Sequence, residues 1–152
     1  MTAPIVRQVL RRLLLLLLLP TLSACGAVCG FGRSGDVTVV AAPDANGSSA
    51  TAVDLVVVTT EQLANQLVAL DAVDYFAARP QLIADNPVDL TVTSWEVTPS
   101  QSIGPNDFSA PCGTDAVFVF ASYSAPGSHR AKLAGFDDVV IELGPDKFEV
   151  TQ

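Results

Sequence analysis

The chain has 152 residues, of which 49% are hydrophobic and 16% are charged, and this size and composition suit one globular domain with a single core. Its 16 acidic residues outnumber its 8 basic residues, which gives a formal net charge of −8. Nucleic acids and anionic lipid surfaces attract clusters of lysine and arginine, so the acidic balance argues against both as partners.

Residues 1–24 have the features of a secretory signal peptide. A segment with three arginines precedes seven consecutive leucines, and the tetrapeptide LSAC follows at positions 22–25. The apolar run is shorter than the roughly 20 residues that a membrane span needs. Because a cysteine stands at the expected cleavage site, the tetrapeptide resembles the lipobox of bacterial lipoproteins. This resemblance implies that Cys25 becomes the first mature residue and carries diacylglycerol and an N-acyl chain such as palmitate.

Processing at this site changes the charge of the chain and indicates its location. Removal of the signal peptide takes away three of the eight basic residues and none of the acidic ones, which leaves a formal charge of −11. Such a surface would suit a basic patch on a partner protein. Gly26 follows Cys25 at the position where the inner-membrane retention signal of Gram-negative bacteria has aspartate. We therefore expect a lipid anchor in the outer membrane, with the protein facing the periplasm.

Two cysteines remain if Cys25 carries lipid. Cys29 and Cys112 form an even pair in an oxidising compartment, which favours a disulfide between them. Two free thiols are the alternative, because sequence spacing does not show that the two Cα atoms approach closely enough to be bridged. The chain has one histidine and no CxxC pair, so we predict no metal site.

The first part of the mature chain predicts a tether and two strands. Residues 25–35 are rich in glycine and short of large apolar side chains, so they indicate a tether that leads into a domain over residues 36–152. Residues 36–42 and 53–59 are valine-rich strand candidates. The segment between them contains Pro, Asp, Asn-Gly and Ser, which form turns. We expect the two strands to pair as a hairpin with a long loop.

The next segment has a helical period and then returns to that of a strand. Leucines at positions 63, 67 and 70 predict a short helix on the core. Asp71 is a helix N-cap candidate for a second turn, which Pro80 is expected to keep brief. Within residues 88–97 the apolar positions alternate but change from even to odd numbers, which predicts a bulge or bend near Ser94.

The last third of the chain completes a β-rich pattern. Residues 100–114 read as a loop, and residues 116–123 as a core strand with Phe118 and Phe120 on one face. An edge segment is expected over residues 129–133, and a hairpin over 138–152. Six or seven strands with one short helical insertion predict a mainly β fold, an antiparallel β-sandwich.

Catalytic constellations are absent from the sequence. His129 follows a Pro-Gly turn, and neither Ser124 nor Ser128 lies in a G-x-S-x-G nucleophile elbow, although a hydrolase of another type could use them. The sequence contains no P-loop, dinucleotide fingerprint or EF-hand loop. We therefore predict a binding or scaffolding protein with no catalytic residues and no cofactor besides the covalent lipid.

The order of these segments resembles one known family, the TssJ (SciN) outer-membrane lipoproteins of bacterial type VI secretion systems. The resemblance covers nearly all of the mature chain, behind the lipobox. It is carried by Pro43-Asp44-Ala45-Asn46-Gly47, which is similar to the family's Asn-Pro-Asp-x-x-Gly, by Val53–Val58, by Asp74-Tyr75-Phe76, by Trp95-Glu96-Val97 with Pro99 and Gln101, and by Phe118–Tyr123 before the basic segment 129–133. Ser48-Ser49 stands where the family has Arg-Pro, so the chain resembles a divergent member.

The resemblance implies a fold, a partner and a binding loop. The fold would be a transthyretin-like β-sandwich with a short helical addition. The protein would tether the secretion membrane complex to the outer membrane by binding the periplasmic domain of the large inner-membrane subunit, TssM. The loop between the first two strands contributes to that contact in the family, so Asp44, Asn46 and Gly47 become candidate partner-binding residues. The alternative is that Asn46-Gly47 only forms a tight turn.

A different binding function is also open. A stand-alone lipoprotein of this kind could bind a small ligand, a glycan or peptidoglycan, since ligand sites combine apolar walls with a few placed polar groups. Tyr75, Trp95 and Tyr123 could line such a site. The more ordinary assignment of these three aromatic residues is to the core.

Overall fold

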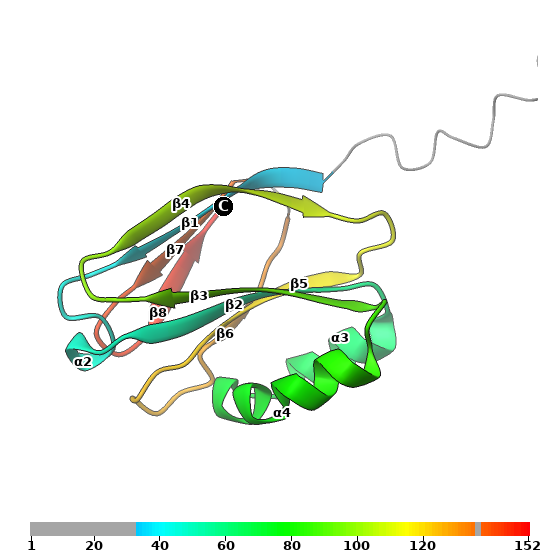
Figure 1. The fold of residues 1–152 in the computed structure, drawn as a ribbon, viewed down its shortest axis with the longest axis horizontal. Helices are drawn as coiled ribbons and strands as arrows, with labels where there is room; N and C mark the ends of the chain where they lie inside the picture. The colour runs from blue at the N-terminus through cyan, green and yellow to red at the C-terminus, as the bar shows by residue number, and fades with distance from the viewer. Residues whose placement is uncertain (1–32, 136–137) are drawn as a thin grey trace, which may run out of the picture. The chain divides into compact units, whose positions relative to one another are not determined.

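A computed structural model describes residues 33–135 and 138–152 of the chain. These residues form two four-stranded sheets that pack face to face, with two helices on the outer face of one sheet (Figure 1). The mainly β sandwich predicted from the sequence is confirmed. The predicted signal peptide, Cys25 and Cys29 lie outside the described residues.

The two sheets have a simple strand order. Sheet A has the order β4-β1-β7-β8 and sheet B has the order β3-β2-β5-β6. All neighbours are antiparallel except β1 and β7, which are parallel. The strands are β1 Arg33–Ala41, β2 Thr51–Val58, β3 Leu90–Val97, β4 Ser102–Ala110, β5 Ala116–Ala121, β6 Arg130–Lys132, β7 Val139–Leu143 and β8 Phe148–Thr151.

The predicted hairpin of the first two strands is wrong. β1 begins at Arg33, already before the predicted start, and lies in sheet A, whereas β2 lies in sheet B. The connection between them holds a single turn, α2 (Ala45–Ser48), and crosses from one sheet to the other. A sandwich permits this crossing, because both strands bury alternate side chains in the same core between the sheets.

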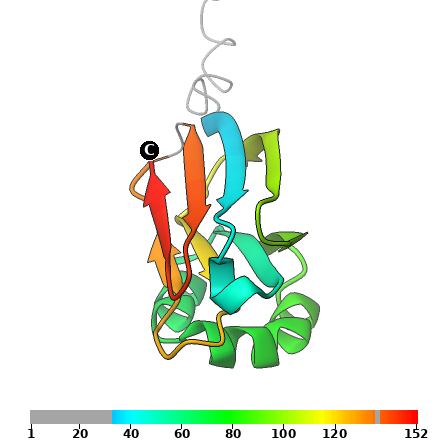
Figure 2. The same ribbon diagram turned by 90° about the vertical axis from the view of Figure 1, so that its left-hand side faces the viewer.

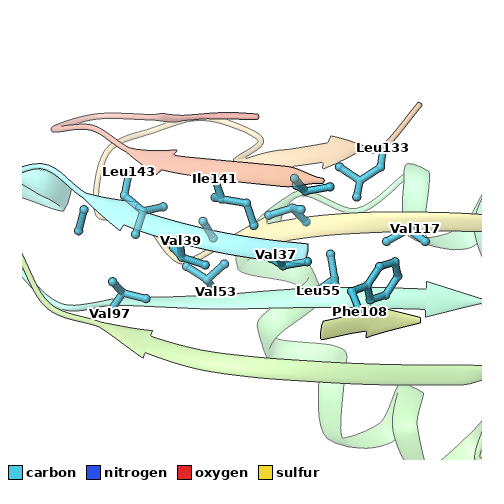
Figure 3. Close-up of a cluster of buried hydrophobic side chains, with 14 of the residues drawn as sticks. Val37, Val39, Val53, Leu55, Val97, Phe108, Val117, Leu133, Ile141 and Leu143 are labelled. Carbon is cyan, nitrogen blue, oxygen red and sulfur yellow. The ribbon is translucent and has the colours of Figure 1, made fainter. Parts of the chain in front are cut away.

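The core between the sheets consists mainly of branched aliphatic side chains. Val37 and Val39 of β1 meet Val53 and Leu55 of β2, with Ile141 of β7 beside them (Figure 3). Each of these five side chains is at most 1% exposed. Branched side chains pack well on pleated sheets, which explains why these strands are rich in valine.

A second core lies between sheet B and the helices. β2 and β5 are buried on both faces, so their alternate residues belong to different cores. Val56, Val58, Phe118 and Phe120 point toward the helices, while their neighbours point into the sandwich. The apolar run of the second strand is therefore buried on both of its faces.

Both helices begin at a capping side chain, and the cap predicted at Asp71 is confirmed. α3 (Glu61–Val68) begins after Thr60, whose side chain accepts a hydrogen bond from the Leu63 N–H. α4 (Ala72–Asp85) begins after Asp71, whose carboxylate accepts one from the Asp74 N–H at 2.9 Å.

The prediction that Pro80 ends the second helix early is wrong, because α4 continues through it. Pro80 lies on the exposed side of α4. Tyr75 before it and Leu82 after it are both buried against sheet B, and this packing on both sides maintains the helix.

The predicted bulge near Ser94 is also wrong. β3 pairs with β2 in unbroken register from Leu90 to Val97. The apolar positions change parity because Leu90 packs in the helix-side core, whereas Val97 packs in the core between the sheets. One regular strand therefore serves two cores on its opposite faces.

The segment predicted as a loop over residues 100–114 contains strand β4. It is an edge strand with a register shift opposite Val37–Val39, and both an edge and a bulge accommodate Pro105. Gly104 has φ of +108°, and a Cβ there would lie 2.5 Å from the Val37 carbonyl oxygen, so only glycine fits. The predicted edge segment and C-terminal hairpin are confirmed as β6 and as β7–β8.

Candidate protein-binding loops

Four loops gather at the end of the sandwich where β1 terminates: residues 42–50, 98–101, 122–129 and 144–147. Backbone hydrogen bonds join them, from the Ser100 N–H to the Ala42 carbonyl at 3.3 Å and from the Asn46 N–H to the Gly144 carbonyl at 3.0 Å. Figure 2 shows β1 running toward α2 at this end. We call these four loops the loop end; it lies roughly 30 Å from the start of β1, since the strand has nine residues.

The α2 turn has an unusual backbone. Asn46, Gly47 and Ser48 have φ angles of +49°, +61° and +64°, so three consecutive residues lie in the left-handed region. This conformation costs about 1 kcal/mol for each residue other than glycine. Such strain persists only where the surroundings enforce it, and here the Gly47 N–H is held by the Pro145 carbonyl of the neighbouring loop at 3.2 Å.

The side chain of Asn46 enforces much of this conformation. It is 5% exposed, its Nδ2 donates to the carbonyls of Ala50 and Ser122 at 3.2 Å, and its Oδ1 accepts from the Ser124 N–H at 2.8 Å. Both donors and the acceptor of the amide are thus used inside the molecule. The side chain of Asn46 thus braces the loop end from inside, and the predicted contact of this residue with a partner stays a prediction.

Asp44 and Gly47, the other two predicted residues, lie at the surface. Both are exposed, and the Asp44 side chain makes no capping hydrogen bond to α2. Gly47 has open space around the position of a Cβ, so its positive φ rather than crowding calls for glycine. The loop end therefore presents a polar surface that is held rigid from inside, a combination typical of loops that bind other molecules.

Tyr123 and His129 hold the adjoining loop in place. The Tyr123 hydroxyl donates to the Lys147 carbonyl at 2.9 Å, and burial raises the pKa of Tyr123 to about 12. Its ring stacks on the His129 ring at 4.7 Å, and His129 Nε2 lies 2.7 Å from the Ala125 carbonyl oxygen. The hydrogen bond of this imidazole thus goes to the backbone rather than to Ser124 or Ser128.

A buried polar cluster beneath α4 was missed by the sequence reasoning. Asp54 of β2 is 0% exposed and accepts hydrogen bonds from the Tyr75 hydroxyl at 2.8 Å and from Arg79 Nη1 at 3.0 Å. Burial and the adjacent carboxylate raise the pKa of Tyr75, and the hydrogen bond to Asp54 raises the pKa of Arg79. The available signal was a single carboxylate inside the apolar run VDLVVV. This cluster fastens α4 to sheet B.

The three aromatic residues considered for a small-ligand site do not meet. Tyr75 belongs to the helix-side core, where it stacks on Phe120 at 3.9 Å. Trp95 and Tyr123 pack with the core on the opposite face of sheet B. The sheet itself therefore separates Tyr75 from the other two.

Two further observations bear on the predicted metal and cysteine chemistry. Within residues 33–135 and 138–152, His, Cys, Asp and Glu side chains nowhere gather in threes that could hold a metal ion. Cys112 is disulfide-bonded, but Cys29 lies outside the described residues, so the pairing of these two cysteines stays a prediction.

Among the described residues, no helix has the length and apolarity to cross a bilayer.

Solved structures similar to this chain include components of bacterial type VI secretion systems. The T6SS lipoprotein TssJ1 from Pseudomonas aeruginosa is similar with a TM-score of 0.62 and 16% identity, over 80% of this chain and 96% of that chain. Lip from Serratia marcescens, a membrane-bound component of the type VI secretion system, is similar with a TM-score of 0.59 and 12% identity, over 78% of this chain and 97% of that chain. A structure of the T6SS protein TssM C-terminal domain from EAEC is similar with a TM-score of 0.59 and 12% identity, over 80% of this chain and 99% of that chain.

These comparisons establish the fold of the chain. The fold is the β-sandwich of the type VI secretion lipoproteins. The resemblance inferred from the order of the segments is therefore confirmed for the fold. No protein-family model matches the sequence, and no curated protein is significantly similar to it.

Proposed function

We propose that the chain is a lipid-anchored envelope scaffold of a type VI secretion system, which tethers the membrane complex to the outer membrane. The loop end binds the periplasmic domain of a large inner-membrane subunit of the TssM type. The fold shared with TssJ1 and Lip is the observation that carries this proposal. The TssM C-terminal domain structure among the similar ones supports the choice of partner.

The direction of β1 supports the same assignment. A chain anchored through Cys25 enters the domain at Arg33, and β1 then leads away to the loop end. The loop end is therefore the part of the sandwich farthest along β1 from the anchor. A scaffold that links two membranes needs this separation between the anchored end and the end that binds the partner.

The test is quantitative capture of the full-length lipidated protein after cross-linking in cells. A C-terminal tag suits this experiment, because Figure 2 shows the C-terminus at the opposite end of the sandwich from α2. The test variant combines Asp44→Arg with Ser49→Arg, two exposed positions whose side chains make no hydrogen bond within the loop. We expect recovery of the large inner-membrane subunit to fall at least about tenfold, since added bulk and charge disrupt a docked surface.

A matched control separates the loop end from a general effect of charge. Asp115→Arg with Asn65→Arg makes the same charge change at exposed positions outside the loop end, and recovery is expected to stay unchanged. Equal losses with both variants, or recovery of no inner-membrane subunit with the native chain, would contradict the proposal.

The lipid anchor has its own test. Cys25→Ser removes the acylation site, and because each buried CH₂ contributes about 0.8 kcal/mol to membrane binding, the variant should leave the membrane fraction. We expect the released protein to unfold at the same urea concentration as the native chain, which would separate loss of the anchor from loss of the fold. Retention of the folded variant in the membrane would count against lipidation at this cysteine.

A further inference from the structure

The outer faces of the two sheets differ in what covers them. The helices α3 and α4 cover the outer face of sheet B, and among the described residues no element covers that of sheet A (Figures 1 and 2). The side chains of sheet A alternate, so Val37, Val39 and Ile141 point into the core and the residues beside them point outward. An open sheet face is thus available on the folded domain.

This open face carries opposed like charges. Glu142 of β7 stands directly opposite Glu149 of β8, and Asp36 of β1 directly opposite Asp107 of β4. Like charges directly opposite each other across strands destabilise a sheet. A chain that keeps two such pairs on one face gives up stability there, which points to a function for the charges.

The cations among the described side chains compensate these carboxylates at one position only. Arg79 pairs with Asp54 under α4, and Arg130 donates to the carbonyls of Val68 and Leu70 at the end of α3. Among the described side chains, only Lys147 reaches the face, through its 2.7 Å ion pair with Glu149. Residues 25–32 contain no lysine or arginine, so that segment of the chain could not supply the missing charge either.

A groove of about 680 Å³ on this face offers a place for a side chain. Its lining includes Val40 and Ala42 of the β1 end, with Glu142, Glu149 and the β7–β8 turn around them. Val40 is 38% exposed, unusual for a large apolar residue of a central strand. The groove therefore combines an apolar surface with carboxylates and one lysine, Lys147, at its sides.

We propose that the outer face of sheet A docks a cationic segment of a partner protein, with basic side chains on the opposed carboxylates and an apolar side chain in the groove over Val40. Charge complementarity selects this occupant. A second copy of this acidic chain, or an anionic membrane surface, would bring like charge to the face. Ala42 and residues 144–147 belong to both the groove and the loop end, whereas Val40, Glu142 and Glu149 lie outside the loop end, so variants of these three residues test this face separately from the proposed function.

The test uses the full-length protein in a nonionic detergent and synthetic peptides as probes. A peptide of alternating lysine and valine should bind, while a glutamate–valine peptide of the same length should not. Glu142→Gln with Glu149→Gln should weaken binding of the lysine–valine peptide at least about tenfold, and Val40→Ser about threefold. Thermal unfolding of each variant checks that the fold is retained.

Matched variants decide between this face and bulk acidity. Glu61→Gln with Glu96→Gln makes the same charge change on exposed residues elsewhere, and the affinity should change less than about twofold. Equal weakening by both double variants would overturn the proposal, as would binding of the glutamate–valine peptide. Dimerisation of the protein that Val40→Ser abolishes would identify a second copy as the occupant instead, and would overturn it too.

Discussion

The outer faces of the two sheets differ in whether their carboxylates are covered by other elements or left open to solvent. The face of sheet B carries a buried carboxylate, and the helices inserted between β2 and β3 cover it and satisfy it with Tyr75 and Arg79. The face of sheet A carries exposed carboxylates that stand opposite one another with a single lysine among them. The buried carboxylate on sheet B therefore holds the fold together, whereas the opposed carboxylates on sheet A remain available to an external partner.

The largest expected effect comes from the buried carboxylate. Asp54→Ala leaves the buried Tyr75 hydroxyl without its acceptor and frees Arg79 from the sheet, so we expect a loss of about 3 kcal/mol in the free energy of unfolding. Asp107→Ala, on the open face, should cost almost nothing. Urea unfolding of both variants measures the difference, and equal losses would remove the contrast between the two faces.

Alkaline pH should destabilise the fold through its only two tyrosines. The pKa of Tyr123 is raised to about 12 by burial, and that of Tyr75 is raised by burial and by Asp54. Their stabilising contribution is present below pH 10 and is lost as pH rises toward 12, because the unfolded chain releases protons that the folded chain retains. The loss should be about 1.4 kcal/mol per pH unit for each tyrosine.

Urea unfolding between pH 8 and pH 11.5 measures this slope. Tyr75→Phe should halve it, because Tyr123 then titrates alone. An unchanged slope in that variant would mean that the buried tyrosine on the helix side does not titrate in this range.

Asn46 lies on neither of the two outer sheet faces, because it is part of the loop end and its side chain hydrogen-bonds to loops that belong to different strands. Asn46→Ala removes three hydrogen bonds inside the loop end and should lower the free energy of unfolding by about 2 kcal/mol. Asn46→Gly keeps the left-handed backbone at less cost, so it should recover part of the loss. If neither variant is destabilised, Asn46 does not brace the loop end.

The smallest effect should have the opposite sign. Glu142→Gln removes one half of an opposed like-charge pair, so we expect the variant to be more stable by about 0.5 kcal/mol at low ionic strength. The gain should fade in high salt, which screens exposed charges. Glu96→Gln, opposite Ala52, is the control and should leave stability unchanged. A destabilised Glu142→Gln would mean that this carboxylate supports the fold.

Sequence patterns predicted the elements whose burial is simple. In β5, alternate side chains point toward two different cores, and the predicted cap at Asp71 stands directly before its helix. The errors arose where a rule depends on the tertiary position of a residue. Pro105 reads as a loop residue until its strand is known to lie at an edge, and the parity change around Ser94 reads as a bulge until two cores are known to exist.

The candidate site was predicted only in part. The turn at Asn46-Gly47 can be read from its residue types, but the carbonyls that Asn46 contacts come from positions up to 76 residues away. The opposed glutamates of sheet A likewise depend on strand register, which no local pattern supplies. Asp54 was visible as a carboxylate in an apolar run, yet its partners on α4 were not.

The parallel pairing of β1 with β7 affects how the domain would carry a mechanical load. β1 lies between β4 and β7 and pairs with β4 from Arg33 to Val40 and with β7 from Val37 to Ala41. A force applied at Arg33 and resisted at the loop end would act along this strand, so its two rows of hydrogen bonds would be sheared together rather than opened one by one. The first strand of the domain is thus built to transmit tension along its length without leaving its sheet.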